Sequence, residues 1–292
     1  MKTPKRIQPL VEEGLVDAVI RQLMSGKEAT VYVVRCGEEI RCAKVYKEAN
    51  QRSFRQAASY QEGRKVRNSR QARAMEKGTR YGRKMQEEVW QNAEVDALYR
   101  LAAAGVRVPT PHICFEGVLL MDLVTDAAGH VAPRLNDVEL TEELALQYHA
   151  QLLHQVLLML CAGIIHGDLS EYNILVDAEG PVIIDLPQAI DAAGNTEAGA
   201  MLERDVANLA TYFSRFAPQL AATQYGKEIW KLYGAGLLSP ETVLTGHVAA
   251  DTRPADVGAV MREIELARKE EEERLRRQQE MHEPVLGART YR

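Results

Sequence analysis

The feature that most constrains this chain is a short aliphatic segment that carries polar residues, IIHGDLSEYNILV, from Ile164 to Val176. An ionised Asp or a polar amide among apolar residues costs free energy unless it has a partner. Asp168 and Asn173 must therefore face a cation, a hydrogen-bonding group or water. A nucleotide with its metal ion meets that requirement.

Chain length and composition narrow the class of protein. With 292 residues the chain is long enough for two lobes with cores of their own, and 46% hydrophobic residues indicate a globular protein. The formal net charge of −5 gives no general reason to expect nucleic-acid binding. The four cysteines form no CxxC pair and no zinc-ligand spacing, which is typical of reduced thiols. The chain also lacks a signal-peptide pattern and any apolar stretch long enough to span a bilayer, so we expect a cytoplasmic protein without membrane residence.

The N-terminal half has the pattern of a small antiparallel sheet. A short helix is expected around Leu10 to Val19. The segments VYVVRC and IRCAKVYK are typical of strands and are joined by a polar turn at Gly37 to Glu39. Residues 88–104 show helical spacing, with Gly105 at the position of a C-terminal cap. A short aliphatic strand, Val118 to Val124, closes this half, and we place a boundary between two lobes just after it.

A strongly basic segment lies between the strands and this helix. From Gln51 to Trp90 there are eleven Arg or Lys residues and four Glu residues, a local excess of seven positive charges. We expect a well-solvated insert at 51–89. Such an insert either binds RNA phosphates or is a solvated loop that covers its own cleft.

The C-terminal half is predicted to be mostly helical. Thr141 begins a long apolar-periodic helix that runs through Cys161, and Gly163 ends it before the polar segment. Two short strands, ILV and VIID, flank a turn at 178–181, and more helices follow from Met201. Mixed charges at helical spacing predict a solvated helical extension over 255–292.

Three polar residues of this half match the needs of phosphoryl transfer. Asp168 precedes Asn173 by five residues, and Asp185 ends the aliphatic strand in PVIIDLPQ. Transfer of a phosphoryl group from ATP needs a carboxylate near the acceptor and oxygen ligands for Mg²⁺. Asp168 would orient or deprotonate the acceptor hydroxyl, while Asn173 and Asp185 would hold the metal. Each residue alone has a plainer interpretation as a turn or cap residue, but their joint spacing favours the catalytic one.

The N-terminal half contains residues that would support such a site. Kinase-like lobes place a strand Lys on the phosphates and pair it with a helix Glu. Lys44 in CAKVYK and Glu94 in WQNAEVDALYRL occupy those places in the chain order. Cys42 lies two residues before Lys44, so its side chain would point to the same side and cover the adenine.

The remaining nucleotide contacts are expected from a hinge and a loop. Met121 would lie behind the adenine, although core packing explains this residue equally well. The backbones of Asp122 and Leu123 would bond the edge of the base. The loop in MSGKEATVY has one glycine rather than the three of a typical phosphate loop. Its groups that could nonetheless donate to phosphate oxygens are Ser25, the backbone of Gly26, and Lys27.

With these motifs in order, the chain resembles the RIO-family atypical protein kinases, and specifically their bacterial branch. The resemblance runs from about Gln22 to Phe213 and is carried by SGKEATVY, CAKVYK, WQNAEVDALYRL, GVRVPTP, VLLMDLV, IIHGDLSEYNILV and IIDLPQA. It implies a bilobal α+β, protein-kinase-like fold. The N-lobe, 1–124, would contain an antiparallel sheet and one main helix, and the C-lobe, 125–254, would be mostly helical.

The resemblance also implies a role for each motif residue. The assignments are Asp168 as the catalytic Asp, Asn173 and Asp185 as metal ligands, Lys44 with Glu94 as the ion pair, and Ser25, Gly26, Lys27 and Glu28 as the loop over the phosphates. The cofactors would be ATP with Mg²⁺ or Mn²⁺. In this family the metal-binding Asp can itself accept phosphate, so Asp185 is also a candidate nucleophile in an ATPase cycle.

Expectations about partners come from the same resemblance. The basic insert matches a loop in which family members autophosphorylate, and its serines are Ser53, Ser59 and Ser69. Family members work on the maturing small ribosomal subunit, so this subunit or its RNA is the expected macromolecular partner. The sequence makes no prediction of the oligomeric state or of the physiological phosphate acceptor.

Two other functions fit parts of the sequence. A small-molecule kinase of the aminoglycoside or choline type also carries an HGDLxxxN element, but here SEYN replaces the usual Gly-containing insert. The other alternative is an RNA- or ribosome-binding module with a regulatory nucleotide site, which the basic insert favours.

The segment after Asp185 limits the kind of protein kinase. Only 19 residues separate Asp185 from Asp205, and they contain no APE element, which argues against a broad peptide kinase. Asp205 itself has two interpretations: it braces the catalytic loop, or it caps the start of a helix.

Overall fold

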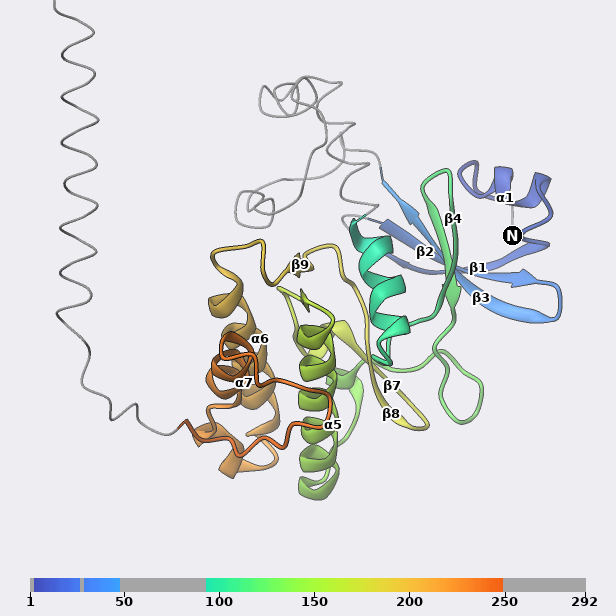
Figure 1. Ribbon diagram of the computed structural model, residues 1–292. Coiled ribbons are helices and arrows are strands. Elements are labelled where there is room, and N and C mark those ends of the chain that lie inside the picture. The colour runs from blue at the N-terminus through green and yellow to red at the C-terminus, as the bar shows by residue number, and fades with distance from the viewer. Residues whose placement is uncertain (1–2, 27–28, 48–92, 249–292) are drawn as a thin grey trace, which may run out of the picture. The chain divides into compact units, whose positions relative to one another are not determined.

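The computed structural model describes residues 3–26, 29–47 and 93–248. In this part the chain forms a five-stranded antiparallel sheet followed by a mainly helical region (Figure 1). All described residues belong to one compact unit that ends at Val248. The predicted α+β architecture is confirmed. The basic insert with Ser53, Ser59 and Ser69, the extension at 255–292, and the loop residues Lys27 and Glu28 lie outside the described residues.

The sheet has the strand order β1-β2-β3-β5-β4, and all neighbouring strands are antiparallel. Its strands are β1 (Ala18–Ser25), β2 (Ala29–Cys36), β3 (Glu39–Tyr46), β4 (Pro111–Phe115) and β5 (Val118–Asp122). The predicted hairpin is therefore β2 and β3, and β5 inserts next to β3. In that pairing Lys44 lies opposite Leu119 and Cys42 lies opposite Met121.

The two faces of the sheet belong to different cores. Successive side chains of a strand point to opposite faces, and Ala43, Val118 and Leu120 join a small core with Leu10 of α1 (Gln8–Glu12). Leu119 instead joins the larger core, which includes buried residues of the helix at 93–103. The strand alternation thus turns Lys44, which follows Ala43, toward the side of the larger core.

The N-terminal helix prediction is partly wrong. Helix α1 ends at Glu12, and Gly14 follows with φ of 71°. The predicted helix would have continued to Val19, but Ala18 and Val19 are the first residues of β1. Val19 pairs with Val34 of β2. Pairing with a neighbouring strand therefore overrides the local helical pattern.

The helix predicted from Thr141 to Cys161 is present, and of the helix predicted over 88–104 the described residues 93–103 are helical. Helix α5 (Glu142–Cys161) begins after Thr141, whose Oγ1 accepts a hydrogen bond from the Leu144 N–H at 3.2 Å. Such an N-cap stabilises a helix by about 1 kcal/mol. Gly163 follows α5 with φ of 73°, a left-handed conformation that glycine adopts without a steric penalty. The turn at Gly163 directs the chain back toward the polar segment.

Beyond α5 the chain alternates short strands with helices. Around the polar segment lie the 3₁₀ turns η2 (Leu135–Asp137) and η3 (Glu171–Asn173) and the strands β6 (Ile164–Ile165), β7 (Ile174–Asp177), β8 (Gly180–Ile183) and β9 (Ile190–Asp191). Helices α6 (Ala198–Phe213) and α7 (Tyr225–Gly234) pack with α5 (Figure 1), and the turn η4 (Pro218–Ala222) contacts α6. Among the described helices, none is both long and apolar enough to cross a membrane.

Candidate active site

A cavity of about 560 Å³ lies between the five-stranded sheet and the segment that contains η3, β7 and β8. The sheet contributes Met24, Cys42, Lys44 and Met121 to its lining, and Gly26 comes from the loop after β1. The rest of the chain contributes Arg134, Asp168, Asn173, Leu175, Ile184, Asp185 and Gln188. Nearly all of the predicted chemical groups that the structure describes therefore face one space. Glu94 contacts this space through Lys44.

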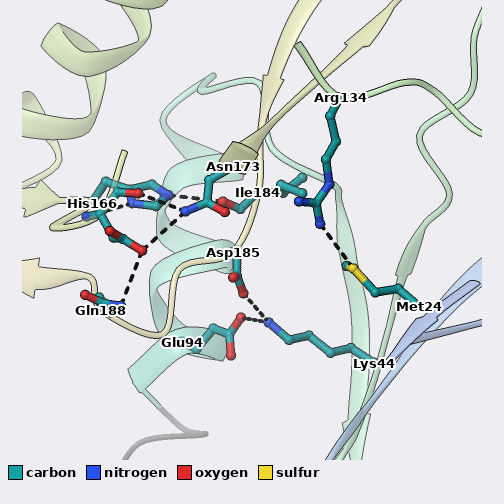
Figure 2. Close-up of polar contacts among 10 residues, drawn as sticks. Met24, Lys44, Glu94, Arg134, His166, Asn173, Ile184, Asp185 and Gln188 are labelled. Atoms are coloured by element: carbon teal, nitrogen blue, oxygen red, sulfur yellow. Dashed lines mark hydrogen bonds and ion pairs between the residues drawn. The ribbon is translucent and has the colours of Figure 1, made fainter. Parts of the chain in front are cut away.

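Lys44 joins the two halves of the site (Figure 2). Its Nζ lies 2.5 Å from Glu94 Oε1 and 3.0 Å from Asp185 Oδ1. The side chains of Lys44 and Glu94 are 10% and 3% exposed, while that of Asp185 is 49% exposed to the cavity. Burial acts to lower the pKa of Lys44, but Glu94 and then Asp185 outweigh it, and the pKa is raised above its ordinary value. The ammonium therefore stays charged, as a phosphate ligand requires.

Asp185 is held ionised in a strained backbone conformation. Its φ is 66°, in the left-handed region that residues with a side chain rarely adopt. Burial acts to raise the pKa of Asp185, but the Lys44 ammonium outweighs this effect and the pKa is lowered. The predicted strand ends at Ile183, two residues earlier than expected, so Asp185 lies in a loop rather than on a strand.

Asp168 is surrounded by donors that fix its position. The Asn173 Nδ2 donates to the Asp168 backbone oxygen at 2.8 Å and approaches its Oδ2 at 3.5 Å. The Gln188 Nε2 donates to the same Oδ2 at 3.3 Å. Burial raises the pKa of Asp168 above its ordinary value, and His166 and Arg204 only partly oppose that effect. A carboxylate with a raised pKa is a stronger proton acceptor than an ordinary Asp.

Asp205 braces the loop that carries Asp168. Its Oδ2 accepts from the Gly167 N–H at 2.7 Å, and its Oδ1 accepts from the Leu169 N–H at 3.2 Å. The alternative reading as a helix cap is wrong, because α6 begins at Ala198 and Asp205 lies within it. Burial raises the pKa of Asp205 to about 6, against the opposing effects of His166 and the two amides. Asn208, one turn further along α6, donates to the Leu169 oxygen at 3.1 Å.

The predicted phosphate loop is described only in part. Gly26 lines the cavity, and the Lys47 Nζ contacts the Ser25 Oγ at 3.2 Å and the Gly26 oxygen at 2.6 Å. Lys47 was not among the predicted residues. Lys47 directly follows β3 and brings a cation to this loop. The sequence alone does not reveal this role, because it depends on the contact with Ser25.

The predicted hinge lines the cavity. Met121, Asp122 and Leu123 are all lining residues, but the Asp122 N–H donates to the Thr110 oxygen at 3.0 Å, so that amide is not free to bond an adenine. The Asp122 carboxylate lies 2.6 Å from the His112 Nε2. Cys42 also lines the cavity, and burial raises its pKa to about 12 against the lowering effect of Lys44. Cys42 is therefore a neutral apolar wall, as the adenine prediction required.

The oxygen groups at the site suit a magnesium ion bound together with phosphates. The Asn173 amide nitrogen is committed to Asp168, which leaves its oxygen as the available acceptor. Asp185 supplies an ionised carboxylate from the same cavity. Mg²⁺ usually binds one or two such oxygens together with substrate phosphates and water. Asn173 and Asp185 therefore fit the metal that the sequence predicts.

The fold and the site together define a protein-kinase-like phosphotransferase: an antiparallel sheet carries a Lys paired with a helix Glu, across a cavity from the Asp and Asn of a loop. Comparison with known proteins identifies the family. Residues 30–225 match the model of the RIO domain. The chain therefore belongs to the RIO domain family. The bilobal kinase-like fold is confirmed.

Several relatives carry the name of the same kinase. The RIO-type serine/threonine-protein kinase Rio1 of Haloferax volcanii is 33% identical over 214 residues, which cover 72% of this chain and 68% of the relative. The human serine/threonine-protein kinase RIO1 is 29% identical over 70% of this chain but only 35% of its own length. The corresponding Schizosaccharomyces pombe kinase is 28% identical, over 70% of this chain and 40% of its own. The prediction of a RIO-type serine/threonine protein kinase is confirmed, and this family implies the use of ATP.

Proposed function

We propose that this protein is an ATP-dependent serine kinase that phosphorylates itself and slowly hydrolyses ATP with Mg²⁺, as a switch on a larger assembly. The observation that carries the proposal is the shared contact of the Lys44 Nζ with Glu94 and Asp185, beside Asp168 in one cavity. Lys44 would bind and orient the phosphates of ATP. The buried Glu94 keeps its ammonium in position.

Asp168 would act on the acceptor. A serine Oγ would attack the γ-phosphorus while its proton passes to the Asp168 carboxylate. The bond between the γ-phosphorus and the bridging oxygen of ADP would break, and ADP would leave. The Gln188 and Asn173 amides hold the Asp168 carboxylate for this step. When bound to Asn173 and Asp185, Mg²⁺ supplies charge neutralisation at the phosphates.

Asp185 would also act as a nucleophile. Its carboxylate is ionised, and an attack by its oxygen on the γ-phosphorus would form an acyl phosphate and release ADP. Water would then hydrolyse that bond and complete an ATPase cycle. Because Lys44 contacts only Oδ1, Oδ2 is the oxygen that would attack.

Other parts of the proposal rest on the resemblance. We propose the bacterial branch of the family, a cytoplasmic location, and the small ribosomal subunit or its RNA as partner through 51–89. We also propose lobes at 1–124 and 125–254 and an extension at 255–292. The gap between the end of β5 at Asp122 and the start of η2 at Leu135 supports a lobe boundary there.

The decisive experiment follows the γ-phosphate of labelled ATP in the presence of Mg²⁺. Acid-stable label on serine, removed by Ala substitution of Ser53, Ser59 and Ser69 together, would support self-phosphorylation. Label that hydroxylamine releases, and that is absent from Asp185→Asn, would support the acyl phosphate. Bound ATP with no transfer to protein or water would contradict both and favour a nucleotide-regulated binding module.

A further inference from the structure

Arg134 is a cation in the cavity wall that none of the proposed steps uses. It precedes η2 and lines the cavity together with Asp168, Asn173 and Asp185. Its backbone is fixed, because Arg134 forms a β-bridge with Leu175 and the neighbouring Pro133 oxygen accepts from the Val176 N–H at 2.9 Å. The side chain therefore projects from a rigid base beside β7, the strand that begins immediately after Asn173.

The partner of the Arg134 guanidinium is a poor one. Its NH2 group donates to the Met24 Sδ at 3.1 Å (Figure 2), and Met24 also lines the cavity. Thioether sulfur is a weak acceptor, whereas a guanidinium offers five donors suited to carboxylate or phosphate oxygens. Among the described residues Arg134 forms no ion pair within 4.0 Å. The Arg134 guanidinium borders the predicted phosphate site, yet its contact with Met24 uses only a small part of its hydrogen-bonding capacity.

The position of Met24 indicates where the guanidinium lies relative to a nucleotide. Met24 is in β1 immediately before Ser25 and Gly26, which begin the predicted phosphate loop, and 41% of its surface is exposed. Arg134 is also close enough to Asp185 for its charge to help lower the pKa of that carboxyl. The guanidinium therefore lies between the phosphate loop and the metal-binding carboxylate, where the phosphates of a bound nucleotide are expected.

We propose that Arg134 is a nucleotide-binding residue that exchanges the Met24 thioether for a phosphate oxygen of ATP or ADP. The contact with Met24 is then a resting position, which holds the side chain at the cavity wall until a nucleotide enters. Arginine suits this task because its planar fork forms two parallel hydrogen bonds with phosphate, which lysine does not. This inference rests on the proposed ATP-dependent function and adds a specific phosphate contact to it.

Calorimetric binding of ADP and of adenosine, with Mg²⁺, tests the proposal. Arg134→Ala should weaken ADP binding by about 10- to 100-fold, the effect of losing a charge-assisted hydrogen bond, and should leave adenosine binding nearly unchanged. Met24→Leu keeps the apolar volume but removes the sulfur, so its affinity for ADP should be equal to or higher than that of the unaltered protein. Arg35→Ala, which removes an exposed cation that does not line the cavity, is the matched control.

Other outcomes would overturn the inference. Equal losses of ADP and adenosine affinity in Arg134→Ala would mean that the residue only shapes the cavity wall. Unchanged ADP affinity would mean that it makes no phosphate contact. Weakened ADP binding in Met24→Leu would mean that the Arg134–Met24 contact itself, rather than its release, supports binding. Failure of the unaltered protein to bind either ligand would instead contradict the proposed function, on which the inference rests.

Discussion

Lys44 and Asp185 are 141 positions apart in the chain, yet the Lys44 Nζ and the Asp185 Oδ1 lie 3.0 Å apart across the cavity. The same ammonium contacts the buried Glu94. One cation therefore ties β3, the helix at 93–103 and the loop after β8 into a single site. A phosphate that enters this site would compete with Asp185 for the Lys44 ammonium. A metal ion bound to Asp185 would then replace the positive charge that this carboxylate loses.

The two carboxylates should be essential for turnover but not for folding. Asp168→Asn removes the proton acceptor and Asp185→Asn removes a metal ligand, so each should reduce γ-phosphate transfer at least about 100-fold. Both side chains border the cavity, so the thermal midpoint should change by only a few degrees. Asp96→Asn, on the exposed side of the helix at 93–103, is the control. Retained transfer in both cavity variants would contradict the assigned roles.

Variants of the Lys44–Glu94 pair should affect stability and activity differently. Lys44→Met leaves the Glu94 carboxylate buried without its cation, which should reduce the free energy of unfolding by about 3–5 kcal/mol. Lys44→Met combined with Glu94→Leu replaces the pair by apolar groups, so urea unfolding should recover most of that loss. ATP turnover should be absent from both variants. An additive loss of stability in the double variant would show that the pair is not energetically coupled.

Asp205 should make stability depend on pH in a predictable direction. The pKa of its carboxyl is about 6 in the folded protein against an ordinary value of 3.8. The folded state thus binds this proton more tightly, so the contribution to stability is full below about pH 4 and is lost as the pH rises through 6. We expect a loss of roughly 2–3 kcal/mol across that window. Asp205→Asn cannot titrate, and its unfolding free energy should lack this slope; equal slopes in the two proteins would contradict the prediction.

Gln188 should tune the basicity of Asp168. Because Gln188 contacts the Asp168 Oδ2, Gln188→Glu would place a like charge beside it and raise the pKa of Asp168 further. The pKa of Asp168 is already raised, so the acidic limb of the kcat–pH profile should move to still higher pH. Gln22→Glu, on the exposed side of β1, adds the same charge away from the cavity and should leave the limb in place. If the acidic limb of the kcat–pH profile did not move in Gln188→Glu, Asp168 would not be the proton acceptor.

Much of the site could be predicted from the sequence because its motifs are short and local. Asp168 and Asn173 are five residues apart in one polar segment, and the Asn173 Nδ2 donates to the Asp168 backbone oxygen at 2.8 Å. Strand alternation likewise predicts that Cys42 and Lys44 share a face. The helix after Thr141 was predicted with its boundaries, because its cap and apolar period are both encoded within a few residues.

Other features depended on contacts that no local pattern records. The extent of α1 was misjudged, because pairing of Val19 with Val34 decides that the chain there is a strand. The role of Asp205 required knowing that α6 begins at Ala198 and passes beneath the loop at Gly167 and Leu169. Gln188 and Arg134 were overlooked for the same reason, since an amide or a guanidinium gains a function only from the group that it meets.

The sequence by itself determined the chemical groups, their order and the local backbone that presents them, because hydrogen-bonding capacity, charge and side-chain periodicity are properties of neighbouring residues. The tertiary structure decided which charged groups pair, which groups hydrogen-bond and which of them line the same cavity. Packing places Lys44 beside Glu94 and Asp185, which outweighs the effect of burial: the pKa of Lys44 is raised and that of Asp185 is lowered. Electrostatic energies depend on distance and burial, and both are set by the fold rather than by separation along the chain.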